Sequence, residues 1–398
     1  MKIVLHDYGG YAFIVGLARR LAGRGHDVFY LHAAHNPTPH GQLDLRPSDP
    51  PGFHSQGLTT NRTLHKDQLI NRWRQETAYG SLLAAAVTEI APDVILSANT
   101  PIDAQSRLQR SSRRHGIPLV YWVQDLIGPA TTAILAERLG PLGRVVGAWY
   151  ARRERDLVAG SSAAVVIAEP FREHLLSRGV RDVPIKVIPN WAPIDALPRL
   201  PKVNDWSQAQ GLSEHFCYLY SGSLGMKHDL APLLALAEVA EDQGAILAVV
   251  SQGPAAERLL RLGKAQGLGS LRLIPFQPMD VYHQVLATGD VLVGILEARA
   301  AAFSVPSKIY SYLCAGRPIL MNAPLASPSA RLVIEAEVGL AVDPGDTAGW
   351  RRAAQRLFGD ESLRAGMGQR AREYAERIID LDAVTNRFER ILEDVTKA

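Results

Sequence analysis

The hydrophobic positions of this chain follow two spacings in turn, one typical of strands and one typical of helices. Short apolar runs that suit buried parallel strands alternate with stretches in which apolar residues recur every three or four positions. The first unit has a strand at 2–6, a turn at Gly9-Gly10, a helix at 12–22 and a strand at 27–32. This order predicts a Rossmann-type βαβ unit at the start of the chain.

The pattern continues, stops near residue 200 and then starts again. Strands are predicted first at 94–97, 119–123, 164–168 and 186–188, and later at 217–221, 245–251, 271–275, 290–296, 318–322 and 339–342. The proline-containing stretch between the two sets, 193–210, has the composition of a linker. We therefore expect an α/β chain with Rossmann-like parallel-sheet domains at 1–195 and 213–378, a linker at 196–212 and a C-terminal helix at 379–398.

Residues 35–66 do not follow this alternation of strand and helix patterns. They hold prolines, glycines and histidines without a period, in a connection longer than the roughly 15 residues expected of a structureless loop. Two interpretations stay open, a loop that closes over an acceptor and a disordered insertion.

Length and composition exclude several classes of protein. At roughly 150 residues per domain, 398 residues predict two or three domains. No apolar run approaches the roughly 20 residues that span a bilayer, and polar residues stand where a secretory signal would be apolar. We expect a cytoplasmic protein in which Cys217 and Cys314 are plain core residues.

The charge is distributed unevenly along the chain. Residues 1–200 carry 23 Lys and Arg against 17 Asp and Glu, whereas the rest carry 20 against 23. A basic first domain suits anionic lipid headgroups or an anionic acceptor, and an ordinary solvated arginine surface is the alternative. Nucleic acid is not expected as a partner, since the basic residues have no interleaved aromatic platform.

Two segments of the second half are candidate anion sites. Residues 221–227 leave a strand, form a glycine turn and end at Lys227, so backbone N–H groups and a cation suit a diphosphate. Residues 304–318 predict a helix with Pro306 in its first turn and Gly316 at its end. The alternatives are an ordinary left-handed turn and an amphipathic core helix.

Motifs spread over about 300 residues resemble retaining glycosyltransferases of family four, closest to bacterial exopolysaccharide and colanic-acid-type enzymes. The residues that carry this resemblance are Asp7-Tyr8-Gly9-Gly10, Gly25-His26-Asp27-Val28, Pro92-Asp93-Val94, Trp122-Val123-Gln124-Asp125, Ile188-Pro189-Asn190-Trp191, Tyr220 to Gly225, and Val305 to Lys308 with Gly316-Arg317-Pro318. The resemblance implies the GT-B fold, in which an acceptor domain and a nucleotide-sugar donor domain face a central cleft.

The resemblance also implies roles for residues of this chain. Lys227, Asp125 and Gln124 are the expected catalytic residues, with Lys227 at the diphosphate and the other two facing the transferred sugar. The expected donor-binding residues are Gly10, Ser223, Phe276, Gln277, Ser304, Val305, Pro306, Ser307, Lys308 and Ser311, and the acceptor side has Gly9 and Asn99.

The chain departs from the family pattern in two features, at three positions. Ser223 stands where many relatives have an arginine, and Phe303 and Ser311 stand where many have two glutamates. Ser311 can form one hydrogen bond but cannot pair in the bidentate manner of a carboxylate. We expect these changes to weaken or redirect donor binding.

No metal or other cofactor is expected. The D-x-D string Asp380-Leu381-Asp382 lies between predicted helices, where capping is its ordinary role. Positioning and stabilisation of the departing nucleoside diphosphate would then supply most of the rate.

Three functions are considered. The first is transfer of a sugar from a nucleotide-diphosphate sugar to a saccharide acceptor, lipid-linked, in surface polysaccharide biosynthesis, with peripheral contact at the cytoplasmic face of the inner membrane. The second is a nucleotide-sugar epimerase on the same fold, and the third is a catalytically silent nucleotide-sugar-binding assembly protein.

Overall fold

The chain forms two compact α/β units, each built around one parallel sheet. The computed structural model describes residues 1–34, 43–60, 69–224, 229–296, 308–378 and 381–397. One unit comprises Met1–Asn190 together with Asp380–Ala398, and the other comprises Trp191–Ile379. The predicted α/β class with two parallel sheets and a helical C-terminal part is confirmed.

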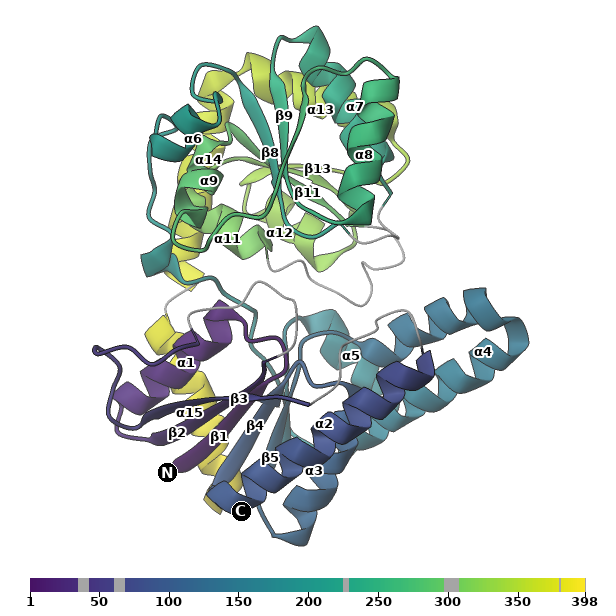
Figure 1. The fold of residues 1–398 in the computed structure, drawn as a ribbon, viewed down its shortest axis with the longest axis vertical. Helices are drawn as coiled ribbons and strands as arrows, with labels where there is room; N and C mark the ends of the chain where they lie inside the picture. Colours follow the sequence, from purple (N-terminus) through teal and green to yellow (C-terminus); the bar gives the residue numbers. More distant parts are fainter. Residues whose placement is uncertain (35–42, 61–68, 225–228, 297–307, 379–380, 398) are drawn as a thin grey trace. The chain divides into compact units, whose positions relative to one another are not determined.

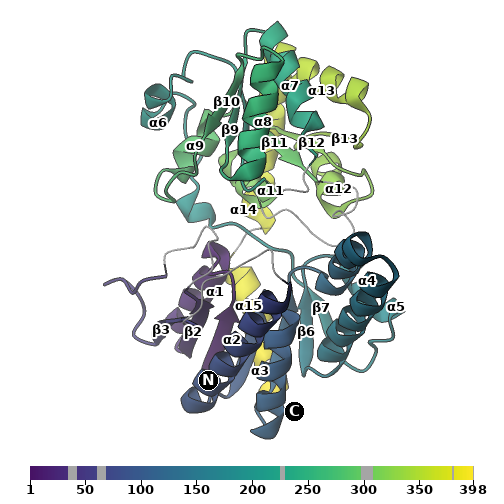
Figure 2. The same ribbon diagram turned by 45° about the vertical axis from the view of Figure 1, so that its right-hand side comes forward.

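The first unit has a seven-stranded sheet in the order β3-β2-β1-β4-β5-β6-β7, and every neighbouring pair is parallel. Its strands are β1 (Lys2–Asp7), β2 (Asp27–Ala33), β3 (Phe53–Leu58), β4 (Val94–Ala98), β5 (Leu119–Val123), β6 (Ala163–Val166) and β7 (Ile185–Val187). Its helices are α1 (Ala12–Gly23), α2 (Leu69–Ile90), α3 (Ile102–Arg114), α4 (Ile127–Ala159), α5 (Glu169–Ser177) and α15 (Leu381–Lys397). Helices α1 and α15 cover one face of the sheet, and α2 to α5 cover the other (Figures 1 and 2).

Strand β3 was not predicted. The segment 35–66 was interpreted as irregular throughout, but Phe53–Leu58 pairs in parallel with β2 at the edge of the sheet. Only its first and last residues are buried, so its sequence lacks the apolar run that marks the central strands. The two earlier interpretations of this segment therefore do not apply to residues 53–58.

The second unit has a six-stranded parallel sheet in the order β10-β9-β8-β11-β12-β13. Its strands are β8 (Cys217–Ser221), β9 (Ile246–Val250), β10 (Leu271–Ile274), β11 (Val291–Ile295), β12 (Ile319–Asn322) and β13 (Gly339–Val342). Its helices are η1 (Ile194–Ala196), α6 (Asp205–Ala209), α7 (Ala231–Asp242), α8 (Pro254–Ala265), α9 (Tyr282–Thr288), α11 (Lys308–Ala315), α12 (Pro328–Glu335), α13 (Thr347–Gly359) and α14 (Glu361–Ile378). Cys217 and Cys314 are free and buried in this unit, as predicted.

Both sheets place the carboxyl ends of their strands at one edge, where open α/β sheets bind ligands. The strand order reverses beside β1 in the first sheet and beside β8 in the second sheet. The strands are buried because helices cover both faces, which explains their continuous apolar runs. The loops that follow β1, β4, β5 and β8 are therefore the places to look for a site.

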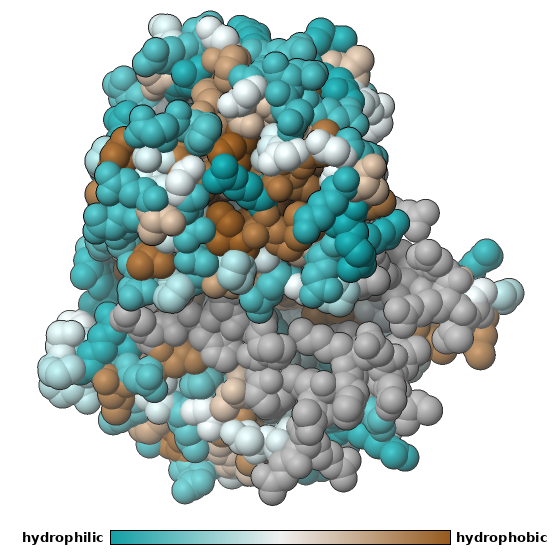
Figure 3. All heavy atoms as spheres, turned by 45° about the horizontal axis from the view of Figure 1, so that its top comes forward, coloured by the Kyte–Doolittle hydropathy of each residue, from teal (hydrophilic) through white to brown (hydrophobic). Residues whose placement is uncertain are grey.

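Helix α4 is long and is interrupted at Gly140, whose backbone is not helical, with Pro141 directly after it. Beyond the break, three large apolar side chains on one stripe are exposed: Leu142 at 65%, Val145 at 68% and Trp149 at 48%. Hydrophobic residues, drawn in brown, are visible at the right-hand end of the first unit in Figure 3. Within the described residues, no helix has both the length and the hydropathy needed to cross a bilayer.

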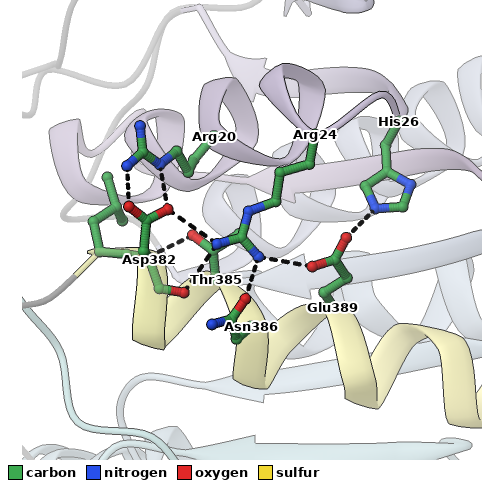
Figure 4. Close-up of polar contacts among 8 residues, drawn as sticks. Arg20, Arg24, His26, Asp382, Thr385, Asn386 and Glu389 are labelled. Carbon is green, nitrogen blue, oxygen red and sulfur yellow. Dashed lines mark hydrogen bonds and ion pairs between the residues drawn. The ribbon is translucent and has the colours of Figure 1, made fainter.

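Helix α15 packs on the first unit although it lies at the end of the chain. Its carboxylates bind the basic end of α1: Glu389 accepts from Arg24 at 2.7 Å and from the His26 ring at 2.7 Å, and Asp382 pairs with Arg20 and Arg24 (Figure 4). Phe388 is fully buried and lies 4.5 Å from Trp122 between ring centroids. Since Asp382 forms these ion pairs, its observed role is structural.

Candidate active site

A pocket of about 170 Å³ lies at the carboxyl edge of the first sheet. The loops after β1, β4 and β5 form it, and its lining residues are Tyr8, Gly9, Tyr11, Asn99, Thr100, Tyr121, Trp122, Val123, Gln124, Asp125 and Ile127. Four residues expected at the site from the sequence, Gly9, Asn99, Gln124 and Asp125, meet here. Gly10 adjoins the pocket and has φ of +68°, a conformation that suits glycine.

The buried carboxylate of Asp7 organises the first of these loops. It accepts hydrogen bonds from the backbone N–H of Gly9 at 3.0 Å and of Tyr11 at 2.6 Å. The Tyr30 hydroxyl, at 3.0 Å, and the Asn99 amide, at 3.2 Å, donate to it as well. Burial raises the pKa of Asp7 to about 6, although these hydrogen bonds act to lower it.

A neutral histidine supports the neighbouring loop after β4. His6 is fully buried, and its ring nitrogens contact the Thr100 and Tyr79 hydroxyls, each at 2.9 Å. Burial, with a smaller effect of His32, lowers the pKa of His6 to about 3. His6 is therefore uncharged at neutral pH, and its contacts give it a structural role behind the pocket.

Gln124 lines the pocket and is fixed by a residue from far along the chain. Its Oε1 accepts a hydrogen bond from Asn190 Nδ2 at 2.6 Å, and both side chains are buried. Among the described residues, Gln124 Nε2 and Asn190 Oδ1 have no hydrogen-bond partner. Unsatisfied buried amide groups are costly, so Gln124, which lines the pocket, has a hydrogen bond to donate to a ligand hydroxyl.

Asp125 is exposed at the pocket, and a second, buried carboxylate lies behind it. Glu154 accepts from the backbone N–H of Ile127 at 2.8 Å and of Gly128 at 3.0 Å, at the start of α4. Burial raises the pKa of Glu154 to about 7, and the charge of Asp125 adds to the shift. The two acids thus influence each other electrostatically at the pocket.

In the second unit, hydrogen bonds from a side chain of α11 fix the glycine turn after β8. Gly222 has φ of +142°, which side chains disfavour. The Tyr312 hydroxyl contacts the backbone N–H of Ser221 at 3.1 Å and the backbone oxygens of Ser221 and Val293, each at 3.2 Å. Ser223 is exposed, and its carbonyl accepts from the Tyr220 hydroxyl at 3.0 Å.

Ser311 lies next to this turn through Tyr282. The Tyr282 hydroxyl hydrogen-bonds with both Ser221 and Ser311, so Ser311 belongs to a hydroxyl cluster beside the glycine turn. Burial raises the pKa of Tyr282 to about 12, which keeps the phenol protonated. The position that relatives fill with a glutamate is therefore neutral here.

The structure describes three of the remaining expected donor-binding residues, and the others lie outside the described residues. Phe276 and Gln277 follow β10, but the Gln277 amide is engaged: Oε1 accepts from Trp206 Nε1 at 2.8 Å and Nε2 donates to the Pro275 carbonyl at 2.9 Å. Lys308 is the first residue of α11 and lies against the glycine turn. Lys227, Ser304, Val305, Pro306 and Ser307 lie outside the described residues.

Sequence reasoning missed the supporting residues of the site, namely Asp7, Asn190, Glu154 and Tyr282. Asp7 and Asn190 stood in motifs that carried the family resemblance, Asp7 at the end of a strand and Asn190 in Ile188-Pro189-Asn190-Trp191. A polar residue at the end of a buried strand was therefore an available signal for Asp7. Asn190 follows the partly exposed strand β7, so the motif was its only signal. Glu154 and Tyr282 lie within helices, and no sequence pattern marks either of them as a site residue.

Known proteins agree with this architecture. Residues 9–191 match the family model of the glycosyl transferase 4-like domain. In Escherichia coli K12, WcaI, named as a colanic acid biosynthesis glycosyl transferase, is 24% identical over 75% of this chain and 73% of its own. In Pseudomonas aeruginosa, WbjE, named as a glycosyltransferase, is 22% identical over 74% of this chain and 73% of its own.

Solved structures are similar over nearly the whole chain. Sucrose-phosphate synthase from Thermosynechococcus elongatus has a TM-score of 0.77 at 15% identity, covering 99% of both chains. Anabaena HepE in complex with UDP-glucose has a TM-score of 0.72 at 16% identity, covering 99% of this chain and 100% of its own. The chain is a glycosyltransferase with the GT-B fold, and its residues 9–191 form a glycosyl transferase 4-like domain.

Proposed function

We propose that this enzyme transfers a sugar from a nucleotide-diphosphate sugar to a saccharide acceptor, with retention of configuration, in surface polysaccharide biosynthesis. The observation that carries the proposal is the pocket where Gly9, Asn99, Gln124 and Asp125 meet at the carboxyl edge of the first sheet. The names of WcaI and of HepE bound to UDP-glucose support the pathway and the donor class.

The proposed roles follow the chemistry of the residues. Gln124 and Asp125 offer an amide and a carboxylate to hydroxyls of the transferred sugar, while Gly9 and Asn99 contact the acceptor. We assign Gly10 to donor binding, and in the second unit we assign the turn at Gly222 to the donor phosphates. In our proposal the donor-binding residues Ser223, Phe276, Gln277, Ser311 and those at 304–308 complete the donor site, and Lys227 stabilises the leaving diphosphate. No metal or cofactor takes part in this proposal.

A lipid-linked acceptor and contact with an anionic membrane form part of the same proposal. The exposed stripe of Leu142, Val145 and Trp149 on α4 supports it, because Arg144 and Arg152 are exposed on the same helix. The Arg153 guanidinium lies 4.9 Å from the centre of the Trp149 ring. Apolar side chains flanked by arginines suit the boundary between headgroups and acyl chains.

Turnover of pocket variants tests the proposed roles. Asp125→Asn and Gln124→Ala should each lower transfer by at least about tenfold, which is about 1.4 kcal/mol of transition-state stabilisation. Asp156→Asn, at an exposed position on α4, is the matched control and should transfer normally. Wild-type turnover in both pocket variants would contradict the proposed roles.

The same assay separates the alternatives. A UDP-N-acetylglucosamine 2-epimerase from Listeria monocytogenes also has this architecture, with a TM-score of 0.61 at 12% identity. An epimerase would convert the donor without an acceptor, whereas a silent binding protein would bind the donor and convert nothing.

A further inference from the structure

Lys308, the first residue of α11, places its ammonium group against the glycine turn after β8. Its Nζ lies 3.8 Å from the centre of the Tyr220 ring. A Cβ atom added to Gly222 would lie 2.7 Å from Nζ and 3.0 Å from Cε. The lysine therefore reaches the backbone of the turn itself, and the absence of a side chain at 222 makes room for it.

This ammonium has no counter-ion among the described residues. No carboxylate there lies within ion-pair distance of Nζ, and its recorded contact is the face of the Tyr220 ring. Burial lowers the pKa of Lys308 to about 7, which is the cost of holding a cation there without an anion. Such a cost is offset when an anion binds next to it.

The turn itself lacks a cation among its described residues. Ser223, which follows Gly222, is neutral and exposed. The adjacent hydroxyls of Ser311 and Tyr282 are neutral as well. Of the described residues, Lys308 is thus the one that brings positive charge to this turn.

We propose that Lys308 binds the diphosphate of the nucleotide-sugar donor and stabilises the nucleoside diphosphate as it leaves. This inference rests on the proposed function and deepens it. As the bond between the anomeric carbon and the terminal phosphate oxygen breaks, that oxygen keeps the electron pair and gains negative charge. The Lys308 ammonium, held against the turn, compensates that charge.

Helix α11 is built to fix this lysine relative to the turn. The Tyr312 hydroxyl, one helical turn further on, contacts the backbone of Ser221 and of Val293. Gly222 donates its backbone N–H to Val250 at 3.1 Å, which ties the turn to β9. Because both partners are anchored to the same sheet, Lys308 need not reorganise when the donor binds.

Calorimetric titration of the full chain with UDP, GDP, ADP and dTDP, and with the matching nucleoside, tests the proposal. For the diphosphate that binds, Lys308→Met should weaken binding by at least tenfold while leaving nucleoside binding unchanged. Lys308→Arg should retain part of the affinity. Lys264→Met, at an exposed position on α8, is the control and should bind like wild type.

A second measurement uses the wild-type protein, so it tests the proposal even if the Lys308→Met variant does not fold. Titration at pH 8 in two buffers of different ionisation enthalpy should show proton uptake on diphosphate binding, since the bound anion restores the charge of Lys308. Burial raises the pKa of the facing hydroxyls of Tyr220, Tyr282 and Tyr312, so they stay protonated at this pH.

The outcomes separate the two claims. Binding of a diphosphate that Lys308→Met leaves unchanged, or binding without proton uptake, would overturn the role of Lys308 alone. A wild-type protein that binds none of the four diphosphates would contradict the proposed function, and this inference with it.

Discussion

The side-chain amide of Asn99 donates a hydrogen bond to the carboxylate of Asp7 across 3.2 Å, linking the loops that follow β4 and β1. Asn99 holds φ of +52°, which side chains other than Asn and Asp adopt rarely. Each Asp7 oxygen takes two donors, since Oδ1 also accepts from Gly9 and Oδ2 accepts from Tyr11 and Tyr30. One carboxylate thus shapes the rim of the first-unit pocket.

Asp7→Asn should destabilise the first unit and lower turnover. An amide nitrogen at either oxygen position would leave two donors without an acceptor, at a cost of about 2 kcal/mol or more. Tyr30→Phe removes one donor and leaves the carboxylate intact, so it should cost about 1 kcal/mol. Urea unfolding measures both, and equal stability of the two variants would contradict the assigned role of Asp7.

Glu154 predicts a pH dependence of stability. Its pKa in the folded protein is about 7, above the ordinary 4.5, because the side chain is buried. The folded state therefore holds the proton more tightly than the unfolded state, and the stabilisation present below pH 4.5 is lost as pH rises through 7. The loss amounts to at most about 3 kcal/mol.

Thermal unfolding between pH 5 and 8 measures this effect. As pH rises, the melting temperature of the wild type should fall relative to that of Glu154→Gln, because Gln does not titrate. Loss of one hydrogen bond to Ile127 or Gly128 adds a constant offset. Parallel melting curves for the two proteins across this range would contradict the raised pKa.

The packing of Phe388 on Trp122 predicts that the end of the chain stabilises its beginning. Phe388→Ala would leave a cavity beside β5, the strand that Gln124 and Asp125 follow, and it should cost about 3–5 kcal/mol of stability. Asp382→Asn, in the exposed ion pairs of Figure 4, should cost much less. Chemical unfolding with limited proteolysis compares the two. A small effect of Phe388→Ala would show that α15 adds little to the first unit.

The stripe on α4 predicts binding to anionic lipid. Replacing Leu142, Val145 and Trp149 together with Ser should reduce co-sedimentation with vesicles of phosphatidylglycerol and phosphatidylethanolamine by at least about tenfold. The matched control replaces Leu325 and Ile334, exposed apolar residues of the second unit, with Ser. Sedimentation unchanged by the triple replacement would contradict the prediction. Wild-type self-association that the replacement abolishes would identify a second copy as the partner instead.

The central strands could be predicted because their burial on both faces leaves a mark in the sequence. The strand β11 was placed at 290–296 from an unbroken apolar run, and the structure has it at Val291–Ile295. Strand β3, with two buried residues at its ends, leaves no such run and was missed. An edge strand is defined by its partner, here β2, and that information is not local.

The site could be predicted only where its residues follow strands. Gly9, Asn99, Gln124 and Asp125 do so, and the parallel sheet brings them to one pocket. The contacts that fix them come from distant positions: Asn190 reaches Gln124 across 66 residues, and Glu389 reaches Arg24 across 365. Such pairs depend on tertiary packing, which no local pattern records.

The central claim is that this chain transfers sugar from a nucleotide-diphosphate donor. Incubating the enzyme with labelled UDP-, GDP-, ADP- and dTDP-sugars and a lipid-linked saccharide extract tests it most directly. The label in the acceptor and the nucleoside diphosphate released are quantified together. The account predicts that one donor class labels the acceptor with equimolar release of nucleoside diphosphate. Donor conversion that needs no acceptor, or donor binding without transfer to any acceptor, would contradict it.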